Sequence, residues 1–230
     1  MEECKTHGKA YLTIRKSTGR VQCKECIKLH PSRRPGQRVE EAKRRYELFK
    51  PQIDAQIREY KLTLRISVLT HYSQGTPTCA KCFVTDLRFL ALDHIQNDGA
   101  SHRRETGGKF YFWAKKHGFP PIFQVLCHNC NFLKYLSTIQ RNETRDVIYK
   151  RKLKNEVMSA YSNGAIKCDL CSVDNIDVLT IDHIHGGGTK HIKQLEQKGT
   201  FLYRELRKLG YPDGYRVLCF NHNLGLMCTG

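Results

Sequence analysis

The hydrophobic and polar positions of the chain form the same pattern twice in its last two thirds. Short runs rich in β-branched, leucine and aromatic residues end in an Asp-His pair or a cysteine, and such bounded runs predict β-strands. After the second run of each pair, NFLKYLSTI (131–139) predicts a helix, and NLGLMC (223–228) gives a weaker helical signal. Each copy is expected to fold as strand, loop, strand and helix, in the α+β class. The strand pairs are LRFLALDHI (87–95) with FQVLC (123–127), and IDVLTIDHI (176–184) with YRVLC (215–219).

The segments before and between these copies are rich in helix-forming residues. VEEAKRRYELFK (39–50) and QIDAQIREYKLTLRISVLTHY (52–72) carry apolar residues at spacings of three and four, which predicts helices. Because proline disrupts a helix interior, we expect two helices divided at Pro51. The charged stretch STIQRNETRDVIYKRKLKNE (137–156) predicts a helical linker, and HPSRRPGQR (30–38) predicts an extended basic connector.

An internal duplication organises most of the chain. An offset of 89 positions superposes RISVLTHYSQGTPTCAKC (65–82) on KNEVMSAYSNGAIKCDLC (154–171), and a three-residue insertion before Phe201 changes the offset to 92. A repeat of about 75 residues is too long for a solenoid and predicts a duplicated small domain. The expected parts are an N-terminal zinc-binding module (1–30), a basic helical linker (31–61), a first α+β domain (62–135), a helical linker (136–150) and a second α+β domain (151–230).

Composition indicates the cellular environment of the protein and the kind of partner that it binds. The chain carries a formal net charge of +17 at pH 7, with Lys and Arg spread over its length, which favours binding along a polyanion such as nucleic acid. A basic protein without such a partner stays an alternative. The sequence begins with MEECKTHGKA, which lacks the apolar core of a secretory signal, and it contains no apolar run long enough for a membrane span. We therefore expect an intracellular, cytoplasmic protein with reduced thiols and no membrane partner.

Eleven cysteines then point to metal rather than to disulfides. CxxC knuckles occur in pairs, and each knuckle presents two ligands to one tetrahedral ion. At one equivalent position the first copy has Cys130 and the second has His222, an exchange that zinc tolerates and that a disulfide does not. Four protein ligands leave no open position, so structural Zn²⁺ is expected. The three predicted zinc sites are Cys79, Cys82, Cys127 and Cys130; Cys168, Cys171, Cys219 and His222; and Cys4, His7, Cys23 and Cys26.

The order of CxxC, Asp-His and CxxC or CxxH followed by Asn resembles the HNH, or ββα-metal, endonucleases, and most closely their zinc-stapled branch with phage recombination endonuclease VII. The resemblance covers both copies and leaves out the N-terminal module. It implies that His94 and His183 are general bases. It also implies that Asp93 with Asn131, and Asp182 with Asn223, ligate a hydrolytic cation, Mg²⁺ or Mn²⁺, in two catalytic sites.

These residue types also suit phosphodiester hydrolysis on chemical grounds. A neutral imidazole can accept a proton from water at physiological pH, and Asp and Asn supply the hard oxygen ligands that Mg²⁺ prefers. The competing interpretation is that each Asp caps a turn and each His packs in the core. Two other recurrences stay open: His102 and His191 suit phosphate contacts, secondary ligands or turn residues, and Asn129 and Asn221 suit left-handed positions in the knuckles.

We therefore expect a metal-dependent endonuclease that cuts double-stranded DNA, with one strand cut by each copy. A monomer with pseudo-two-fold repeats, active in a bacterial or phage-infected cell, is expected, although a dimer is an alternative. Restriction, homing and junction-resolving nucleases fit equally, and a zinc-dependent DNA-binding or architectural protein with inactive copies, or with one active copy, is the main rival. Candidate DNA contacts are Arg33, Arg34, Arg44, Arg45, Arg103, Arg104, Lys115, Lys116, Arg207 and Lys208.

Overall fold

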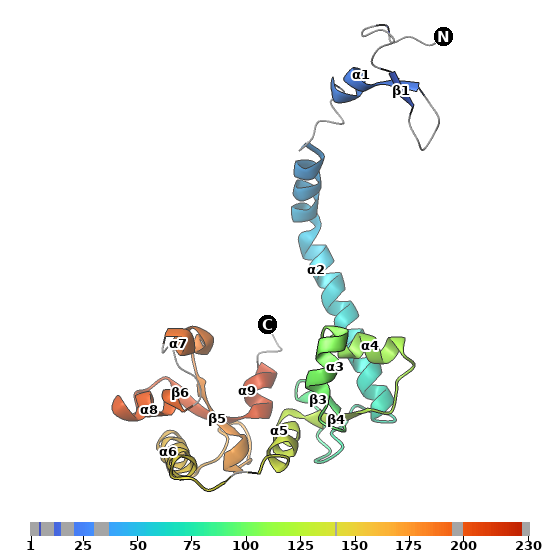
Figure 1. Cartoon of the computed structure of the whole chain (residues 1–230). Coiled ribbons are helices and arrows are strands. Elements are labelled where there is room, and N and C mark those ends of the chain that lie inside the picture. Colours follow the sequence, from blue (N-terminus) through green and yellow to red (C-terminus); the bar gives the residue numbers. More distant parts are fainter. Residues whose placement is uncertain are drawn as a thin grey trace. The chain divides into compact units, whose positions relative to one another are not determined.

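The computed structural model describes residues 5, 12–14, 21–29, 37–140, 142–194 and 200–226, and it divides into two compact units, Met1–Leu62 and Thr63–Gly230 (Figure 1). In the first unit, strands β1 (Leu12–Ile14) and β2 (Val21–Cys23) pair antiparallel. Helix α1 (Lys24–Leu29) follows β2 directly. The boundary between the units falls inside helix α2 (Gln37–Tyr72).

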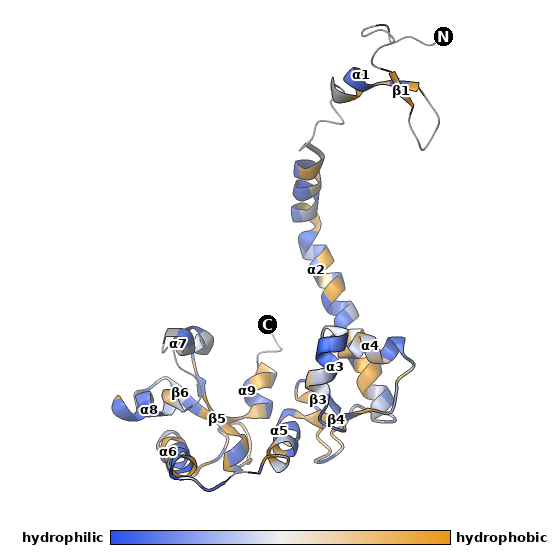
Figure 2. Ribbon diagram, in the orientation of Figure 1, coloured by the Kyte–Doolittle hydropathy of each residue, from blue (hydrophilic) through white to orange (hydrophobic). Residues whose placement is uncertain are grey.

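Helix α2 is continuous through Pro51, so the prediction of two helices divided there is wrong. Proline removes the single backbone bond that its N–H would donate to the carbonyl of Glu47. Residues 39–52 are all exposed, and most turns of α2 are hydrophilic (Figure 2), so water can bond to that carbonyl instead. Helix-forming residues on both sides of Pro51 then outweigh the local disruption.

The second unit contains the two repeats, each with a two-stranded antiparallel sheet followed by a helix. Their strands pair in the same register: Leu90 faces Cys127, and the equivalent Leu179 faces Cys219. The first repeat consists of β3 (Leu90–His94), α3 (Gly99–Thr106), α4 (Phe110–Lys116), β4 (Phe123–Cys127) and α5 (His128–Ser137). The second consists of η3 (Ile176–Val178), β5 (Leu179–His183), α7 (Gly188–Gln194), α8 (Phe201–Lys208), β6 (Tyr215–Cys219) and α9 (Phe220–Leu226).

Each repeat is preceded by a helix that supplies part of its core. The last turns of α2 bury Val68 and Leu69 in the first repeat, and α6 (Arg145–Tyr161) buries Val157 and Met158 in the second. Helix α5 ends at Ser137, and α6 begins after Thr144, whose hydroxyl caps it by accepting from the Val147 N–H. The predicted helical linker of residues 136–150 thus contains the end of one helix and the start of another. No helix in the described ranges is long and apolar enough to cross a membrane.

The two repeats pack on each other through the helices that follow their second knuckles, α5 and α9 (Figure 1). At the centre, the side-chain oxygen of Asn221 accepts from the Asn129 N–H, and the side-chain oxygen of Asn129 accepts from the Asn221 N–H, both at 3.0 Å. Both residues are buried and helical, and neither has a positive φ. The prediction of left-handed positions for Asn129 and Asn221 is therefore wrong. These asparagines recur because they join the two repeats.

This reciprocal pair gives a direct test of the interface. Asn129→Ala removes the acceptor for the buried Asn221 N–H, and an unpaired buried donor costs about 1–3 kcal/mol. We expect either alanine variant to lower the free energy of unfolding by about that amount, measured by urea denaturation. Because each single variant removes a different one of the two hydrogen bonds, the double variant should cost more than either single. The exposed Asn142→Ala should change stability by less than about 0.5 kcal/mol.

Candidate functional site: two cysteine clusters and two Asp-His centres

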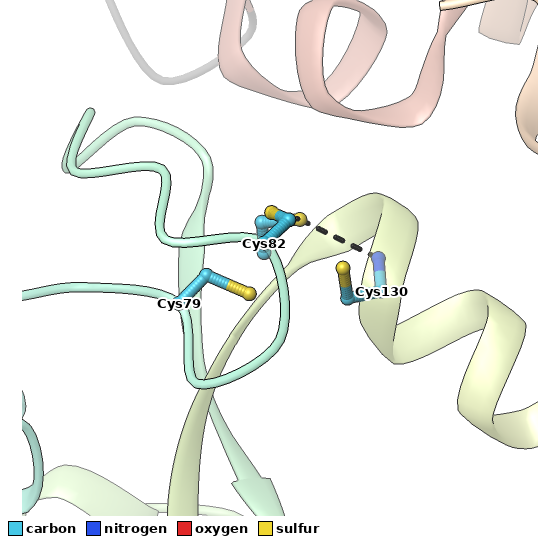
Figure 3. Close-up of side chains that lie close together, drawn as sticks. Cys79, Cys82 and Cys130 are labelled. Atoms are coloured by element: carbon cyan, nitrogen blue, oxygen red, sulfur yellow. Dashed lines mark hydrogen bonds between the residues drawn. The ribbon is translucent and has the colours of Figure 1, made fainter.

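The first candidate zinc site brings together four sulfur atoms from two knuckles. The thiols of Cys79, Cys82, Cys127 and Cys130 lie within 4.8 Å of one another, as tetrahedral zinc requires of its ligands. Figure 3 shows Cys79 and Cys82 on the loop before β3 and Cys130 on the first turn of α5. These residues therefore have the position and the chemistry of a structural Zn²⁺ site.

Backbone bonds shape each first knuckle in the same way. The Cys79 N–H donates to the carbonyl of Val84, and the next residue, Ala80, donates to the carbonyl of Val125 on β4. In the second repeat Cys168 donates to Val173, and Asp169 donates to Val217. The first knuckle is thus tied to the strand that leads into the second knuckle, which brings ligands about 45 residues apart into one cluster.

The second candidate zinc site has three thiols and one imidazole. Cys168, Cys171, Cys219 and His222 again place their ligand atoms within 4.8 Å of one another. His222 uses Nδ1, which lies 3.5 Å from the Cys168 sulfur and 3.4 Å from the Cys219 sulfur. The imidazole therefore takes the place of the Cys130 thiol, as the sequence exchange predicts.

The protonation of these thiols follows their surroundings. Burial raises the pKa of Cys127 to about 11, although a hydrogen bond from the Asn221 side chain acts in the opposite direction, and burial raises the pKa of Cys171 to about 12. At Cys79 burial is outweighed by backbone N–H groups, including those of Cys82 and Cys127, which lower the pKa to about 7. The thiols of Cys127 and Cys171 thus resist ionisation without metal, and Zn²⁺ supplies the positive charge that stabilises several thiolates in one place.

The predicted N-terminal zinc site falls only partly within the described structure. Cys23 ends strand β2 and is buried, and Cys26 follows on helix α1. Cys4 and His7 lie outside the described residues, so the third zinc site stays a prediction.

The Asp-His pair of the first repeat lies at the end of strand β3. Asp93 faces Gln124 across the sheet, and the Gln124 amide donates to its Oδ2 at 2.9 Å. The Lys134 ammonium on α5 donates to the same oxygen at 2.6 Å and also to the backbone carbonyl of His94. Asp93 and His94 are both buried. Because the carboxylate bonds to side chains from two other elements, turn capping does not account for it.

The second repeat has the same pair with a different cation. Asp182 faces Arg216, whose Nε donates to Oδ2 at 2.9 Å. Arg216 is the equivalent of Gln124, while the equivalent of Lys134 is Leu226. The positive charge thus comes from a helix in one repeat and from a strand in the other, and it reaches the same carboxylate oxygen. The two repeats thus keep a positive charge on the carboxylate although it comes from different positions in the chain. Core packing alone does not require a charge there.

A second histidine bonds to each histidine of these pairs. Nε2 of His94 lies 2.7 Å from Nδ1 of His102, and Nε2 of His183 lies 2.8 Å from Nδ1 of His191. Burial lowers the pKa of His94 and of His183. In both repeats the second histidine lies eight positions after the first, so the sequence shows that it recurs. The sequence does not show that it bonds to the first histidine.

The predicted asparagine ligands lie on the helices beside these strands. Asn131 is on α5, one turn before Lys134, and residues three apart share a helix face. Since Lys134 bonds to Asp93, that face is directed toward the carboxylate. Asn223 is on α9, which packs against β5 in the second repeat. The cation-binding roles of Asp93, Asn131, Asp182 and Asn223 stay predictions.

All eight predicted DNA-contacting residues in the described ranges are exposed, but some already contact other side chains. Arg207 pairs with Glu156 and donates to the Tyr149 hydroxyl at 2.9 Å, and the Arg103 guanidinium lies over the Phe110 ring. Arg33 and Arg34 lie outside the described residues. The exposed members are Arg44, Arg45, Arg103, Arg104, Lys115, Lys116, Arg207 and Lys208.

Comparisons with protein-family models, with curated proteins and with solved structures give no match to this chain. The functional interpretation accordingly depends on the motifs of the sequence and the geometry of the two repeats.

Proposed function

We propose that the chain is a metal-dependent DNA endonuclease in which each repeat cuts one strand of a duplex. The observation that carries this proposal is the duplicated centre: an Asp-His pair at the end of a strand, in one register, with a cation on the carboxylate and a second histidine on the imidazole. Both copies keep the Asp, the His and the second His at equivalent positions and place a cation on the carboxylate, although burial of polar groups costs free energy, and this favours chemistry over packing.

The residues of the repeats fit the two metals that this function needs. The first cluster offers four thiols and the second offers three thiols and an imidazole, each set within 4.8 Å, which suits structural zinc. The side-chain bonds to Asp93 and Asp182 from the described chain all end on Oδ2, which leaves Oδ1 of each carboxylate for another ligand. We assign Asp93 with Asn131, and Asp182 with Asn223, to Mg²⁺ or Mn²⁺, since carboxylate and amide oxygens suit these hard cations.

The proposed reaction is hydrolysis of a phosphodiester bond. His94 or His183 accepts a proton from a water molecule while the water oxygen bonds to phosphorus. The bond from phosphorus to the 3′ oxygen breaks, and that oxygen takes up a proton from solvent. When bound, the cation contributes stabilisation of the negative charge on the phosphoryl and leaving oxygens. Lys134 and Arg216 hold the carboxylates in place, and the net charge of +17 attracts the DNA backbone.

One observation favours the rival function, a zinc-dependent DNA-binding or architectural protein without cleavage. Each carboxylate already has a cationic partner, at 2.6 Å from Lys134 and at 2.9 Å from Arg216. These ion pairs compensate the carboxylate charge within the protein, so a hydrolytic cation has to share the carboxylate with them. This rival predicts DNA binding that weakens steeply with salt, without strand cleavage under any divalent cation.

The test is incubation of the zinc-loaded chain with supercoiled plasmid and either Mg²⁺ or Mn²⁺. We expect linear product that disappears when the divalent cation is omitted. Plasmid that stays supercoiled with both cations, under conditions where the protein binds it, would support the rival instead. Sequencing the cleavage ends from a randomised duplex library and from a four-way junction then separates restriction or homing activity from junction resolution.

A further inference from the structure

We infer that His102 and His191 are positioning residues that fix the tautomer of His94 and His183, so that Nδ1 of each is the nitrogen that accepts the proton from water. The inference deepens the proposed function and rests on it. Its basis is a set of contacts that both repeats make with equivalent atoms.

The ring-to-ring bond has the same connectivity in both repeats. Nε2 of the first histidine meets Nδ1 of the second, at 2.7 Å in one repeat and 2.8 Å in the other, with the two rings nearly perpendicular. The second histidine comes from the helix that follows the strand, α3 or α7. Two neutral rings can form this bond only when one nitrogen donates and the other accepts, and the bond then sets the proton position on both rings.

The ordinary tautomer of neutral histidine carries its proton on Nε2. If both rings keep that tautomer, Nε2–H of His94 donates to Nδ1 of His102, and no ring has to adopt the less stable form. The opposite direction requires the less stable tautomer in both rings. The observed connectivity therefore leaves Nδ1 of His94 and of His183 unprotonated.

A glycine lies close against Nδ1 of the first histidine in both repeats. A Cβ atom placed on Gly99 would lie 2.9 Å from Nδ1 of His94, and one placed on Gly188 would lie 2.9 Å from Nδ1 of His183. Neither glycine has a positive φ, so backbone conformation does not require glycine there. Any side chain at either position would press against Nδ1, so glycine keeps this edge of each ring free of a side-chain contact.

The other faces of the ring are held by aromatic contacts. The His94 ring packs edge-to-face on Phe110 and Phe123, with centroids 4.8 and 4.6 Å away, and the His183 ring packs on Tyr215 at 4.7 Å. The His102 ring in turn packs on Trp113 at 4.3 Å. These contacts restrict the position of each ring, while the bond to the second histidine determines which nitrogen carries the proton.

A spectroscopic experiment tests the tautomer without reference to cleavage. The full chain is labelled with ¹⁵N-histidine and loaded with zinc, and long-range ¹H–¹⁵N correlations are recorded well above the ordinary histidine pKa. His94 is assigned from the signals that vanish in His94→Asn. We expect the Nε2–H tautomer for His94 in the wild type. An Nδ1–H tautomer would overturn the inference, whatever the protein does to DNA.

Two substitutions of His102 separate positioning from packing. His102→Asn keeps an acceptor close to the place of Nδ1, and Nε2 of His102 makes no hydrogen bond to the described residues that asparagine would lose. His102→Leu fills similar space without an acceptor. We expect the His94 tautomer to persist in the asparagine variant and to become a mixture in the leucine variant. An unchanged His94 spectrum in His102→Leu, with zinc content retained, would contradict the inference.

The same variants have an expected kinetic effect in an Asp182→Asn background, where the first repeat alone cuts. His102→Leu should lower kcat about 100-fold with little change in KM, because general-base catalysis contributes on this order. His102→Asn should recover most of that loss, and Gly99→Ala should match the leucine variant because its methyl group would press against Nδ1. Equal losses in His102→Asn and His102→Leu would contradict positioning. Absence of cleavage in the parent would instead refute the proposed function and leave the tautomer result standing.

Discussion

Asp93→Asn and Asp182→Asn are each expected to turn double-strand cleavage of a plasmid into nicking, and the double variant to leave the plasmid supercoiled. Each carboxylate lies at the end of its own strand and is assigned to its own cation, so removal of one charge should disable one repeat. Loss of the cation removes several kcal/mol of charge stabilisation, and we expect strand cleavage by that repeat to slow about 1000-fold. Gel separation of supercoiled, open-circular and linear plasmid over time measures both rates.

Asparagine is chosen because it keeps the shape of the carboxylate. The substituted side chain retains an oxygen for Lys134 in the first repeat and for Arg216 in the second, so the fold should survive. The matched control is Asp86→Asn, since Asp86 pairs with Arg88 at the surface of the first repeat and the equivalent residue in the second repeat is Asn175. It should leave both rates unchanged.

The DNA products of these variants distinguish between the possible roles of the two repeats. Linear DNA from a single variant would mean that one centre cuts both strands or that two chains cooperate. Cleavage by the double variant at the wild-type rate would remove both carboxylates from the chemistry. Nicking by only one of the single variants would assign all the activity to a single repeat.

The sequence predicts the strands and knuckles of the repeats because their signals are local. Short β-prone runs ending in polar residues define β3 to β6, and cysteine spacing defines the two clusters. The exchange of Cys130 for His222 indicates metal before any coordinates are considered. Duplication strengthens each of these signals, since both copies carry them independently.

Features that depend on contacts between distant segments could not be predicted in the same way. The cationic side chains on the two carboxylates, Lys134 and Arg216, are at non-equivalent positions, so an alignment of the two repeats does not reveal them. Asn129 and Asn221 recur visibly, but their bond joins the two copies, and a local interpretation assigns them to turns. Pro51 suggests a break that an exposed helix can avoid by hydrating one carbonyl.

Loss of one zinc ligand is expected to have the largest effect on stability. Cys130→Ala and His222→Ala each leave a cluster with three ligands, and structural zinc contributes on the order of 10 kcal/mol of apparent folding free energy in small domains. We expect each alanine variant to lose about one bound zinc ion per chain and to unfold its own repeat at ordinary temperature. Zinc content by elemental analysis, together with thermal unfolding followed by circular dichroism, measures both effects.

Exchanging the ligands between the repeats distinguishes the effect of losing zinc from the effect of changing the packing at these positions. Cys130→His and His222→Cys reproduce in each repeat the ligand that the other repeat carries, so both variants should keep their zinc and unfold close to the wild-type temperature. Cys228→Ser, at the cysteine that the sequence leaves out of the three predicted zinc sites, is the control for a lost thiol. Full zinc content in Cys130→Ala, or unfolding that a zinc chelator does not change, would contradict a structural metal in these clusters.

The interface between the repeats extends this prediction from one cluster to the other. Phe89 of the first repeat packs on the His222 ring of the second at 5.0 Å, and Asn129 and Asn221 bond reciprocally next to ligands of both clusters. Unfolding one repeat removes these contacts and leaves the asparagine N–H of the other repeat without its acceptor. The intact repeat in His222→Ala should therefore unfold at a lower temperature than in the wild type. If the repeats unfold independently, His222→Ala will not shift the unfolding temperature of the first repeat. Adding the Asn129→Ala, Asn221→Ala pair will then not change that temperature either.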